Sequence, residues 1–394
     1  MTSVQAVNAP VVVCGGGIVG LATALAFARS GQSVALLGPK ATFAPADPEV
    51  FYPRVYAISP ATQQFLATLG VWDMLPAERL TRVEAMEIHG DGDGFLNLSA
   101  WQAAVPELAW IIEANEIERV LSQAVQIFGL PWVNEKFASY APGRLTTDQG
   151  RVMQAELFVA ADGAKSPLRA AAGVTVDERP YGVTALVAHF NCELPHQGVA
   201  LQWFGQDGVL ALLPMPDTLV GAQVSMVWSL KDPIGQALLA LPPEERAKAL
   251  EVRLNAATGG RLGRLTLRSP VHGFPLSLNL TPMIGEGIAL AGDAAHRLHP
   301  LAGQGLNLGL GDVQSLVATI SQRETFRSPG DPILLRRYRR ARAEPVLAMR
   351  LVTDGLHKIF ATEAAPVAWL RNMGMNLVEK LPFLKRQLIQ GASR

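Results

Sequence analysis

Short apolar runs alternate with helix-like apolar spacing along the first forty residues. Residues 11–13 are three valines, whose β-branched side chains favour a short buried strand. The glycines at 15–17 predict a turn, and residues 18–28 predict a helix that ends at Gly31. A second strand is predicted over 34–37, so the chain starts with a strand–turn–helix–strand unit.

The first 28 residues of the chain carry no charged side chain, as a signal peptide or a membrane-spanning helix could. A signal peptide has a positive first region, whereas the first basic residue here is Arg29. A spanning helix is disfavoured by the glycines at 15–17, each of which costs about 1 kcal/mol relative to alanine. We therefore expect neither kind of segment.

Two later apolar runs each end in a glycine and aspartate pair. Residues 157–161 lead into Asp162-Gly163, with Arg169 shortly after, and residues 287–291 lead into Gly292-Asp293. The carboxyl ends of buried strands are where an open α/β sheet presents ligand contacts. A lone aspartate at such a place is more often a turn or cap residue, and Arg169 has two readings: cofactor recognition or a pairing with Asp162 across the turn.

Residues 184–230 have a different sequence pattern, in which apolar and polar residues alternate. From Gln223 to Leu230 the period is two, which predicts a sheet with one buried face. This sheet is the candidate substrate layer. Its expected apolar pocket wall consists of Val199, Leu201, Trp203, Val209, Ala211 and Leu213, although each of these could equally be ordinary core.

The tail from Asp331 is helical in pattern and rich in arginine, including Arg336, Arg337, Arg339, Arg340 and Arg342. Trp369, Met373 and Leu377 recur at helical spacing, with Arg371, Lys380, Lys385 and Arg386 nearby. Two interpretations stay open for this segment. It could lie on a membrane surface, or it could pack on its own domain.

Composition excludes several classes of protein. With 394 residues, 49% hydrophobic and 17% charged, the chain is a folded protein of two or three lobes rather than a disordered one. Lys and Arg number 34 and so do Asp and Glu, so no basic field exists for nucleic acid. Cys14 and Cys192 form no metal-ligand spacing and no disulfide framework, which fits a reducing cytoplasm.

The first turn carries candidate chemistry, because Gly15, Gly17 and Gly20 match the glycine fingerprint for dinucleotides. The first glycine permits the tight turn, the second lets the backbone approach a pyrophosphate, and the third lets the helix pack on the strand. The fingerprint also expects an acidic residue at the end of the second strand, where this chain has Gly38. Alone, the pattern also fits a glycine-rich turn in another α/β protein.

Together, the glycine fingerprint, Asp162-Gly163 and Gly292-Asp293 resemble the class A flavoprotein aromatic hydroxylases. The resemblance extends to the ubiquinone-biosynthesis hydroxylase family and covers nearly the whole chain. It is carried by residues 54–61 with 69–72, 210–214, 292–307, 353–356 and 381–386, of which 292–307 is the most specific.

This resemblance implies an FAD-dependent monooxygenase that hydroxylates the ring of a polyprenylated phenol with NAD(P)H and O2. By the same analogy Asp293 binds the ribityl chain, and residues 303–307 surround the flavin pyrimidine. Because the cofactor activates oxygen, no catalytic side chain is expected. The implied cofactor-binding residues are Gly15, Gly17, Gly20, Arg54, Asp162, Gly292, Asp293, Pro300, Gly303, Gly305 and Asn307.

Simpler readings accompany several of these residues. Asp293 could instead cap a helix that starts at Ala294, and Arg54 could be a surface cation. His296 and His299 lack a third ligand at suitable spacing, so we expect polar loop contacts and no metal site.

The expected fold class is α/β, with a Rossmann-like FAD-binding domain, an antiparallel substrate-binding sheet and a helical C-terminal segment. The FAD-binding domain is expected over 1–75, 110–180 and 280–330, the substrate domain over 76–109 and 181–279, and the helical segment over 331–394. The expected location is the cytoplasm, with peripheral contact to the inner face of the membrane and with biosynthetic complex partners. Two alternatives stay open: a hydroxylase of a soluble phenol, and a non-catalytic flavoprotein-like subunit, which the glycine at position 38 suggests.

Overall fold

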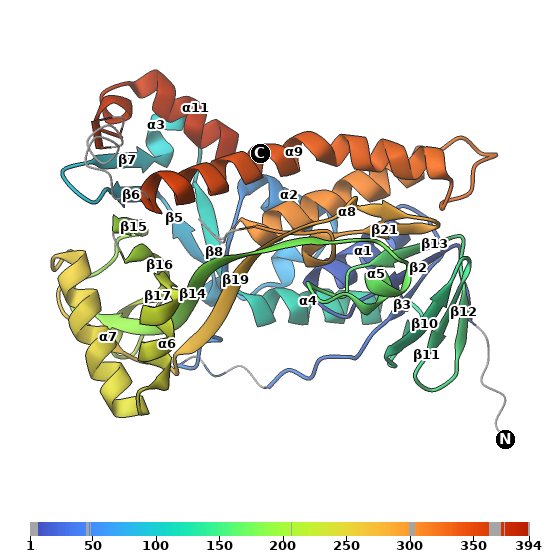
Figure 1. Cartoon of the computed structure of the whole chain (residues 1–394), viewed down its shortest axis with the longest axis horizontal. Helices are drawn as coiled ribbons and strands as arrows, with labels where there is room; N and C mark the ends of the chain where they lie inside the picture. The colour runs from blue at the N-terminus through green and yellow to red at the C-terminus, as the bar shows by residue number, and fades with distance from the viewer. Residues whose placement is uncertain are drawn as a thin grey trace.

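The computed structural model describes residues 7–44, 47, 49–205, 207–298, 304–361, 372–373 and 375–392. Within these ranges the chain forms a body with a parallel sheet, a second body with a large twisted sheet, and a C-terminal part whose long helix runs along both (Figure 1).

The first body is built on a six-stranded sheet in the order β20-β21-β13-β2-β3-β9. All neighbouring pairs are parallel except β20 and β21. The predicted strand–turn–helix–strand unit is confirmed as β2, α1 and β3. The strands are β2 (Val11–Cys14), β3 (Val34–Leu37), β9 (Trp132–Val133), β13 (Leu157–Ala160), β20 (Ile284–Gly285) and β21 (Ile288–Leu290), and the helix is α1 (Ile18–Arg29).

Two small sheets and several helices complete this body. The central strands β2, β3 and β13 are buried along their whole length because helices cover the parallel sheet and exclude water from it. One small sheet is β4 (Val55–Ile58), β8 (Ala109–Glu113) and β5 (Thr81–Val83); the other is β1 (Val7–Asn8), β12 (Val152–Gln154), β11 (Arg144–Thr147) and β10 (Phe137–Ala141). The helices and short turns are α2 (Pro60–Thr68), α4 (Ala114–Ile127), α5 (Pro167–Ala171), α8 (Gly305–Ser321), η1 (Trp72–Met74), η2 (Ala77–Arg79) and η3 (Gly292–Ala294).

The second body is a nine-stranded sheet with α6 (Asp232–Ala240) and α7 (Pro243–Thr258) packed on one face. Its pairing is antiparallel, as predicted, except that β15 and β6 run parallel. The strands are β6 (Ala85–His89), β7 (Phe95–Ser99), β14 (Asp177–Cys192), β15 (Val199–Gly205), β16 (Gly208–Thr218), β17 (Gly221–Lys231), β18 (Leu265–Leu267), β19 (His272–Leu280) and β22 (His296–Arg297).

The prediction that this sheet has one buried face is wrong. On β17 Val224 and Met226 pack toward α6 and α7, but Gln223 and Ser225 on the opposite face are also completely buried. The polar face is covered because it lies on the side of Leu213, which pairs with Ser225 and packs against the three-stranded sheet of the first body. The alternation in the sequence therefore identified which residues share a face, but it did not reveal that both faces are buried.

The C-terminal part contains α9 (Pro332–Ala361) and α11 (Pro382–Ala392), and α11 packs on α3 (Ala100–Ala103). Side chains at helical spacing also cap the edge strand β7. Asn372 accepts from Gly94 N–H at 3.1 Å, Asn376 from Phe95 N–H at 3.0 Å, and Glu379 from Asn97 N–H at 2.7 Å. These bonds support the prediction that the segment packs on its own domain.

Some of the basic side chains in this C-terminal part are buried in ion pairs. Arg342 is buried and bonded to Asp312, and Lys385 is buried against Glu379 at 2.7 Å. Trp369 and Arg371 lie outside the described residues. No helix in the described ranges is long and apolar enough to cross a bilayer.

Candidate functional site

The glycine turn after β2 has the shape that the fingerprint requires. A Cβ on Gly15 would lie 2.1 Å from Ala161 O, and one on Gly20 would lie 1.9 Å from Gly15 O, so both positions exclude side chains. A Cβ on Gly17 would meet no atom within 4 Å, and the helix that follows begins without a side-chain cap. The start of α1 therefore offers free N–H groups facing open space, as an anion site needs.

The two strand-ending aspartates lie at the same edge of the sheet, because β13 and β21 are parallel neighbours. The Oδ1 atom of Asp162 is buried with no hydrogen-bond partner in the described structure, and burial raises the pKa of this carboxyl. The Asp293 carboxylate also lacks a hydrogen bond from any described residue. Asp293 lies inside η3, whose cap is Ala291, so its alternative reading as a helix cap is wrong.

Arg169 joins the two aspartate turns. Its Nη1 donates to Ala294 O at 2.9 Å and its Nη2 donates to Ala164 O at 2.8 Å. The guanidinium is buried and its hydrogen bonds go to these two carbonyls, one from each turn. Neither reading from sequence anticipated this, because Arg169 makes no described ion pair with Asp162 and instead braces the turn that carries Asp293.

A buried charged network holds the same turn from the other side. The Asp312 carboxylate accepts from Gly292 N–H at 2.9 Å, lies 2.7 Å from His296 Nε2 and accepts from Arg342 Nε at 2.8 Å. Burial by itself would raise the pKa of Asp312, but His296, Arg342 and the Gly292 N–H outweigh burial and hold it below its usual value. His296 thus makes the polar contact expected of it, within a network that sequence reasoning missed.

The side chain of Tyr56 on β4 is affected by the charges of both Arg54 and Asp293. The Arg54 guanidinium carbon lies 4.9 Å from the centre of the Tyr56 ring, although the Arg54 side chain is exposed. Burial, with the negative charges of Asp293 and Glu118, raises the pKa of Tyr56 to about 12 against the opposing effect of Arg54. The charges of Arg54 and Asp293, far apart in sequence, therefore both act on the Tyr56 hydroxyl.

The start of α8 faces the end of β4. Asn307 donates from Nδ2 to Ala57 O at 2.8 Å and accepts from Ser59 N–H at 3.1 Å. Its amide thus ties α8 to β4, while Gly305 opens the helix with free space around its Cα. Two of the predicted site residues, Pro300 and Gly303, lie outside the described residues, as does His299.

Gly38 occupies the place where an acidic residue was expected, and a side chain does not fit there. Its φ is +152°, and a Cβ would lie 2.7 Å from Gly16 N. A glutamate at position 38 would collide with the Gly16 backbone, so the glycine there has a structural role. Backbone contact between the two turns is the reason, because a Cβ on Gly16 would in turn lie 2.4 Å from Pro39 O.

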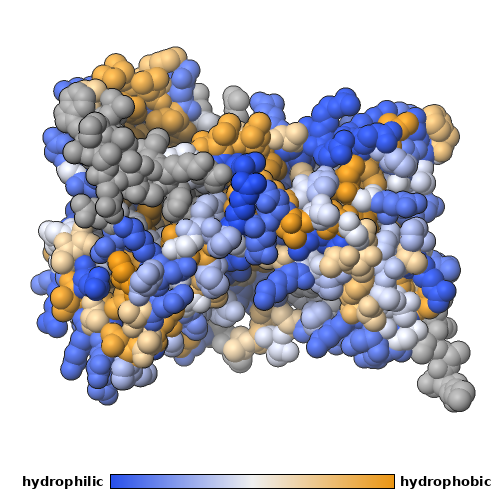
Figure 2. Space-filling view, in the orientation of Figure 1, coloured by the Kyte–Doolittle hydropathy of each residue, from blue (hydrophilic) through white to orange (hydrophobic). Residues whose placement is uncertain are grey.

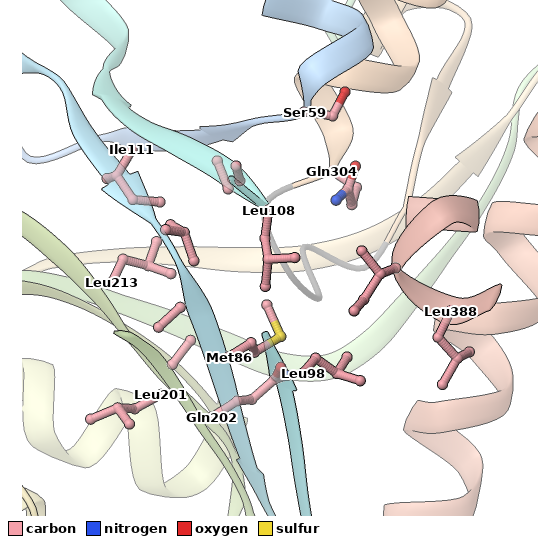
Figure 3. Close-up of a pocket in the computed structure, with 16 residues that line it drawn as sticks. Ser59, Met86, Leu98, Leu108, Ile111, Leu201, Gln202, Leu213, Gln304 and Leu388 are labelled. Carbon is pink, nitrogen blue, oxygen red and sulfur yellow. The ribbon is translucent and has the colours of Figure 1, made fainter. Parts of the chain in front are cut away.

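A cavity of about 100 Å³ lies between the first body, the face of the nine-stranded sheet opposite α6 and α7, and α11. Ser59 and Gln304 lie at one end, and Met86, Leu98 and Gln202 at the other (Figure 3). Sixteen residues line it, and only three have polar side chains. They are Ala57, Ser59, Val83, Met86, Leu98, Leu108, Ala109, Ile111, Ala200, Leu201, Gln202, Ala211, Leu213, Gln304, Leu388 and Ile389.

The predicted pocket wall was partly right. Ala211 and Leu213 line the cavity, and so does Leu201, but Val199, Trp203 and Val209 do not. On β15 the cavity is lined by Ala200 and Gln202 together with Leu201, which also packs in the core beside Leu212. The lining residues of β5, β7 and β8 had no local signal, because their common position arises only from strand pairing.

The arrangement fits FAD on structural grounds. A cradle with open space at Gly17 lies at the edge where the unpartnered Asp162 Oδ1 atom and the Asp293 carboxylate also lie. Acceptor-only carboxylates suit sugar or ribityl hydroxyls, and free N–H groups suit the pyrophosphate. Among the described residues no cluster of His, Cys, Asp and Glu could hold a metal ion.

Comparison with known proteins gives a consistent result. The FAD binding domain family matches residues 8–352. A ubiquinone hydroxylase of Rhodospirillum rubrum is 33% identical over 98% of this chain and 89% of its own length. The 3-demethoxyubiquinol 3-hydroxylase of Escherichia coli is 29% identical over 97% of both chains.

Solved structures agree on the fold. The p-nitrophenol 4-monooxygenase of Pseudomonas putida superposes with a TM-score of 0.75 over 98% of both chains, at 18% identity. A Klebsiella pneumoniae protein complexed with FAD and uric acid superposes with a TM-score of 0.71, covering 98% of this chain and 97% of that one, also at 18% identity.

Proposed function

The chain belongs to the FAD binding domain family, in its ubiquinone-biosynthesis hydroxylase branch, and on that basis we propose that it hydroxylates the aromatic ring of a polyprenylated phenol. It is an FAD-dependent monooxygenase that uses O2, with NAD(P)H as the reductant typical of the family.

The observation that carries this proposal is the apolar cavity next to the cofactor cradle. Ser59 and Gln304 belong to the segments that Asn307 ties together beside the glycine-rich turns. The opposite end is formed by hydrocarbon side chains, with Gln202 as the single polar group there. Such a cavity suits an electron-rich ring with little charge and excludes water from it.

FAD held in this cradle would, after reduction by NAD(P)H, supply the oxygen activation for hydroxylation, in which one atom of O2 enters the ring and the other becomes water. We propose that Gly15, Gly17 and Gly20 hold its pyrophosphate and that Asp293 binds the ribityl chain. The N-terminus of α8 at Gly305 contributes partial positive charge toward the pyrimidine end, which stabilises negative charge there. The remaining proposed contacts are Arg54, Asp162, Gly292, Pro300, Gly303 and Asn307.

We propose peripheral membrane contact through an exposed apolar surface on the C-terminal part. This C-terminal apolar surface consists of Trp101, Met373, Leu377, Leu381, Phe383 and Leu388, of which Trp101 is 87% and Phe383 68% exposed. Figure 2 shows an orange, hydrophobic area over α11 at the upper left. The exposed cations Lys380 and Arg386 adjoin it, a combination that suits an anionic bilayer surface.

Leu388 belongs to both the cavity lining and this surface. A long prenyl tail in the membrane could therefore leave the cavity beside α11 without crossing the protein. This geometry favours a lipid-tailed phenol over a small soluble one.

The test compares substrates on purified protein reconstituted with FAD. We expect a prenylated phenol to stimulate NAD(P)H oxidation and to yield product that carries oxygen from labelled O2. Stimulation by soluble phenols alone would identify a different hydroxylase. A chain that binds no FAD and copurifies with pathway enzymes would identify a non-catalytic subunit.

A matched pair of variants connects the activity to the cavity. Ala211→Leu adds three carbons inside the cavity, whereas Ala256→Leu makes the same change at an exposed position on α7. We expect Ala211→Leu to raise KM for the phenol or abolish its turnover while FAD binding is retained, and Ala256→Leu to behave like wild type. Equal effects of both variants would contradict the assignment of the cavity.

A further inference from the structure

The end of β3 differs chemically from the usual dinucleotide site. That site places a carboxylate there, which accepts hydrogen bonds from the adenosine ribose. Gly38 cannot be replaced by such a residue without collision, as shown above. If FAD binds in the cradle, some other group of this chain must meet its ribose.

Two side chains lie where that group is needed. β9 pairs in parallel with β3, with Trp132 opposite Leu36, so its end lies beside Gly38. Trp132 Nε1 donates to Gly38 O at 2.9 Å, and Lys40 Nζ lies 5.1 Å from the centre of the Trp132 ring. The Lys40 N–H is bonded to Asn134 Oδ1 at 2.9 Å, which fixes the backbone from which this side chain starts.

The charge of Lys40 is available to a ligand. The side chain is exposed, and in the described structure its ammonium contacts an aromatic ring and no carboxylate. An ammonium is a donor only, whereas the carboxylate of the usual site is an acceptor only. The ribose hydroxyls can serve both, since a hydroxyl both donates and accepts.

We propose that Lys40 and Trp132 form the adenosine subsite of the FAD site in this chain, with the Lys40 ammonium donating to a ribose hydroxyl. Trp132 supplies an apolar ring that holds the Lys40 side chain and bounds the subsite. This proposal rests on the FAD-dependent function proposed above and adds a residue pair to which no role has been given.

The sign of the charge distinguishes this subsite from the usual one. A carboxylate repels a phosphate on the ribose, whereas a cation attracts it, which is the distinction that separates NAD sites from NADP sites. The subsite should therefore bind adenosine 2′,5′-bisphosphate better than 5′-AMP. The two probes differ only in the ribose phosphate. The ratio of their affinities therefore reports the interaction between that phosphate and Lys40.

The experiment is a competition titration of the full-length apoprotein, with quenching of FAD fluorescence as the readout. We expect the bisphosphate to compete roughly two- to fivefold better than 5′-AMP, as for one exposed ion pair, and the preference to fade at high salt. Lys40→Glu should reverse the preference. Lys248→Glu makes the same charge change on an exposed position of α7 and should leave the ratio as in wild type.

The outcomes separate the two proposals. Equal competition by both probes in wild type and in Lys40→Glu would overturn the subsite while FAD binding and turnover stand. A wild-type chain that binds no FAD would refute the proposed function and the subsite together. Thermal unfolding of each variant verifies that a changed ratio does not reflect loss of fold.

Discussion

Replacing Asp312 by asparagine tests whether the buried network holds the turn that carries Asp293. The carboxylate is completely buried and accepts bonds from the Gly292 N–H, His296 and Arg342 at 2.7–2.9 Å. Asparagine has nearly the same shape, but its NH2 group can only donate. At least one of the three donors around position 312 would therefore point at the NH2 group and lose its acceptor.

The expected loss of stability is about 3 kcal/mol. Removing one partner of a buried ion pair costs about 3–5 kcal/mol, because the remaining charge stays buried without compensation. The substituted amide would keep one carbonyl acceptor, which places the expectation at the lower end. The matched control is Asp177→Asn, since Asp177 and Arg179 form an exposed pair, for which about 0–1 kcal/mol is expected.

The assay is urea unfolding of the apoprotein followed by tryptophan fluorescence, with FAD retention as a second readout. We expect Asp312→Asn to lower the unfolding midpoint clearly and to weaken FAD binding, because Gly292 and His296 lie on either side of Asp293. The reasoning fails if Asp312→Asn costs no more than Asp177→Asn.

The loss of stability in Asp312→Asn should depend on pH in a defined direction. The pKa of Asp312 is lowered in the folded state, so its contribution is fully present above the unfolded value of about 4 and is lost as pH falls through the folded value. The difference between wild type and Asp312→Asn should be constant from neutral pH to about 5 and should shrink in stronger acid. A difference that grows in acid would contradict this account.

Three further predictions follow from the site and the surface. Asp293→Ala should lose FAD, with a cost on the order of 1.5–3 kcal/mol for a charged hydrogen bond, while the apoprotein keeps its unfolding midpoint; unchanged flavin content would contradict the ribityl assignment. Gly38→Ala should weaken FAD binding because its Cβ meets Gly16 N, and titration showing wild-type affinity would mean that the two turns can separate. Phe383→Glu together with Trp101→Glu should reduce flotation with anionic liposomes; these point changes are preferable to truncation, which would uncap β7, and flotation equal to wild type would argue against the membrane surface.

Much of the dinucleotide unit could be predicted from sequence because its determinants are local. Three valines, a glycine turn and a helix-like run lie within twenty residues, and β2 and α1 appear where these patterns place them. The aspartates after β13 and β21 could also be identified, since a buried run followed by a Gly/Asp pair needs no distant information.

Residues without a local signal were missed or misread. Asp312 and Arg342 read as ordinary helix residues, yet they form the buried network with His296. The sequence indicates a ligand or Asp162 as the partner of Arg169, but its hydrogen bonds go to carbonyls of two turns that are far apart in sequence, at Ala164 and Ala294.

The sequence by itself determined the strand–turn–helix unit, the order of the elements and the residue types offered to the cofactor, because backbone propensity and hydrophobic period act over a few neighbours. Only the tertiary structure decided the rest. The set of β15 residues that line the cavity, the burial of both faces of β17 and the rejection of any side chain at Gly38 depend on which surfaces the fold brings together. Packing between distant segments has no signature in either segment alone, since each contact is a property of the pair.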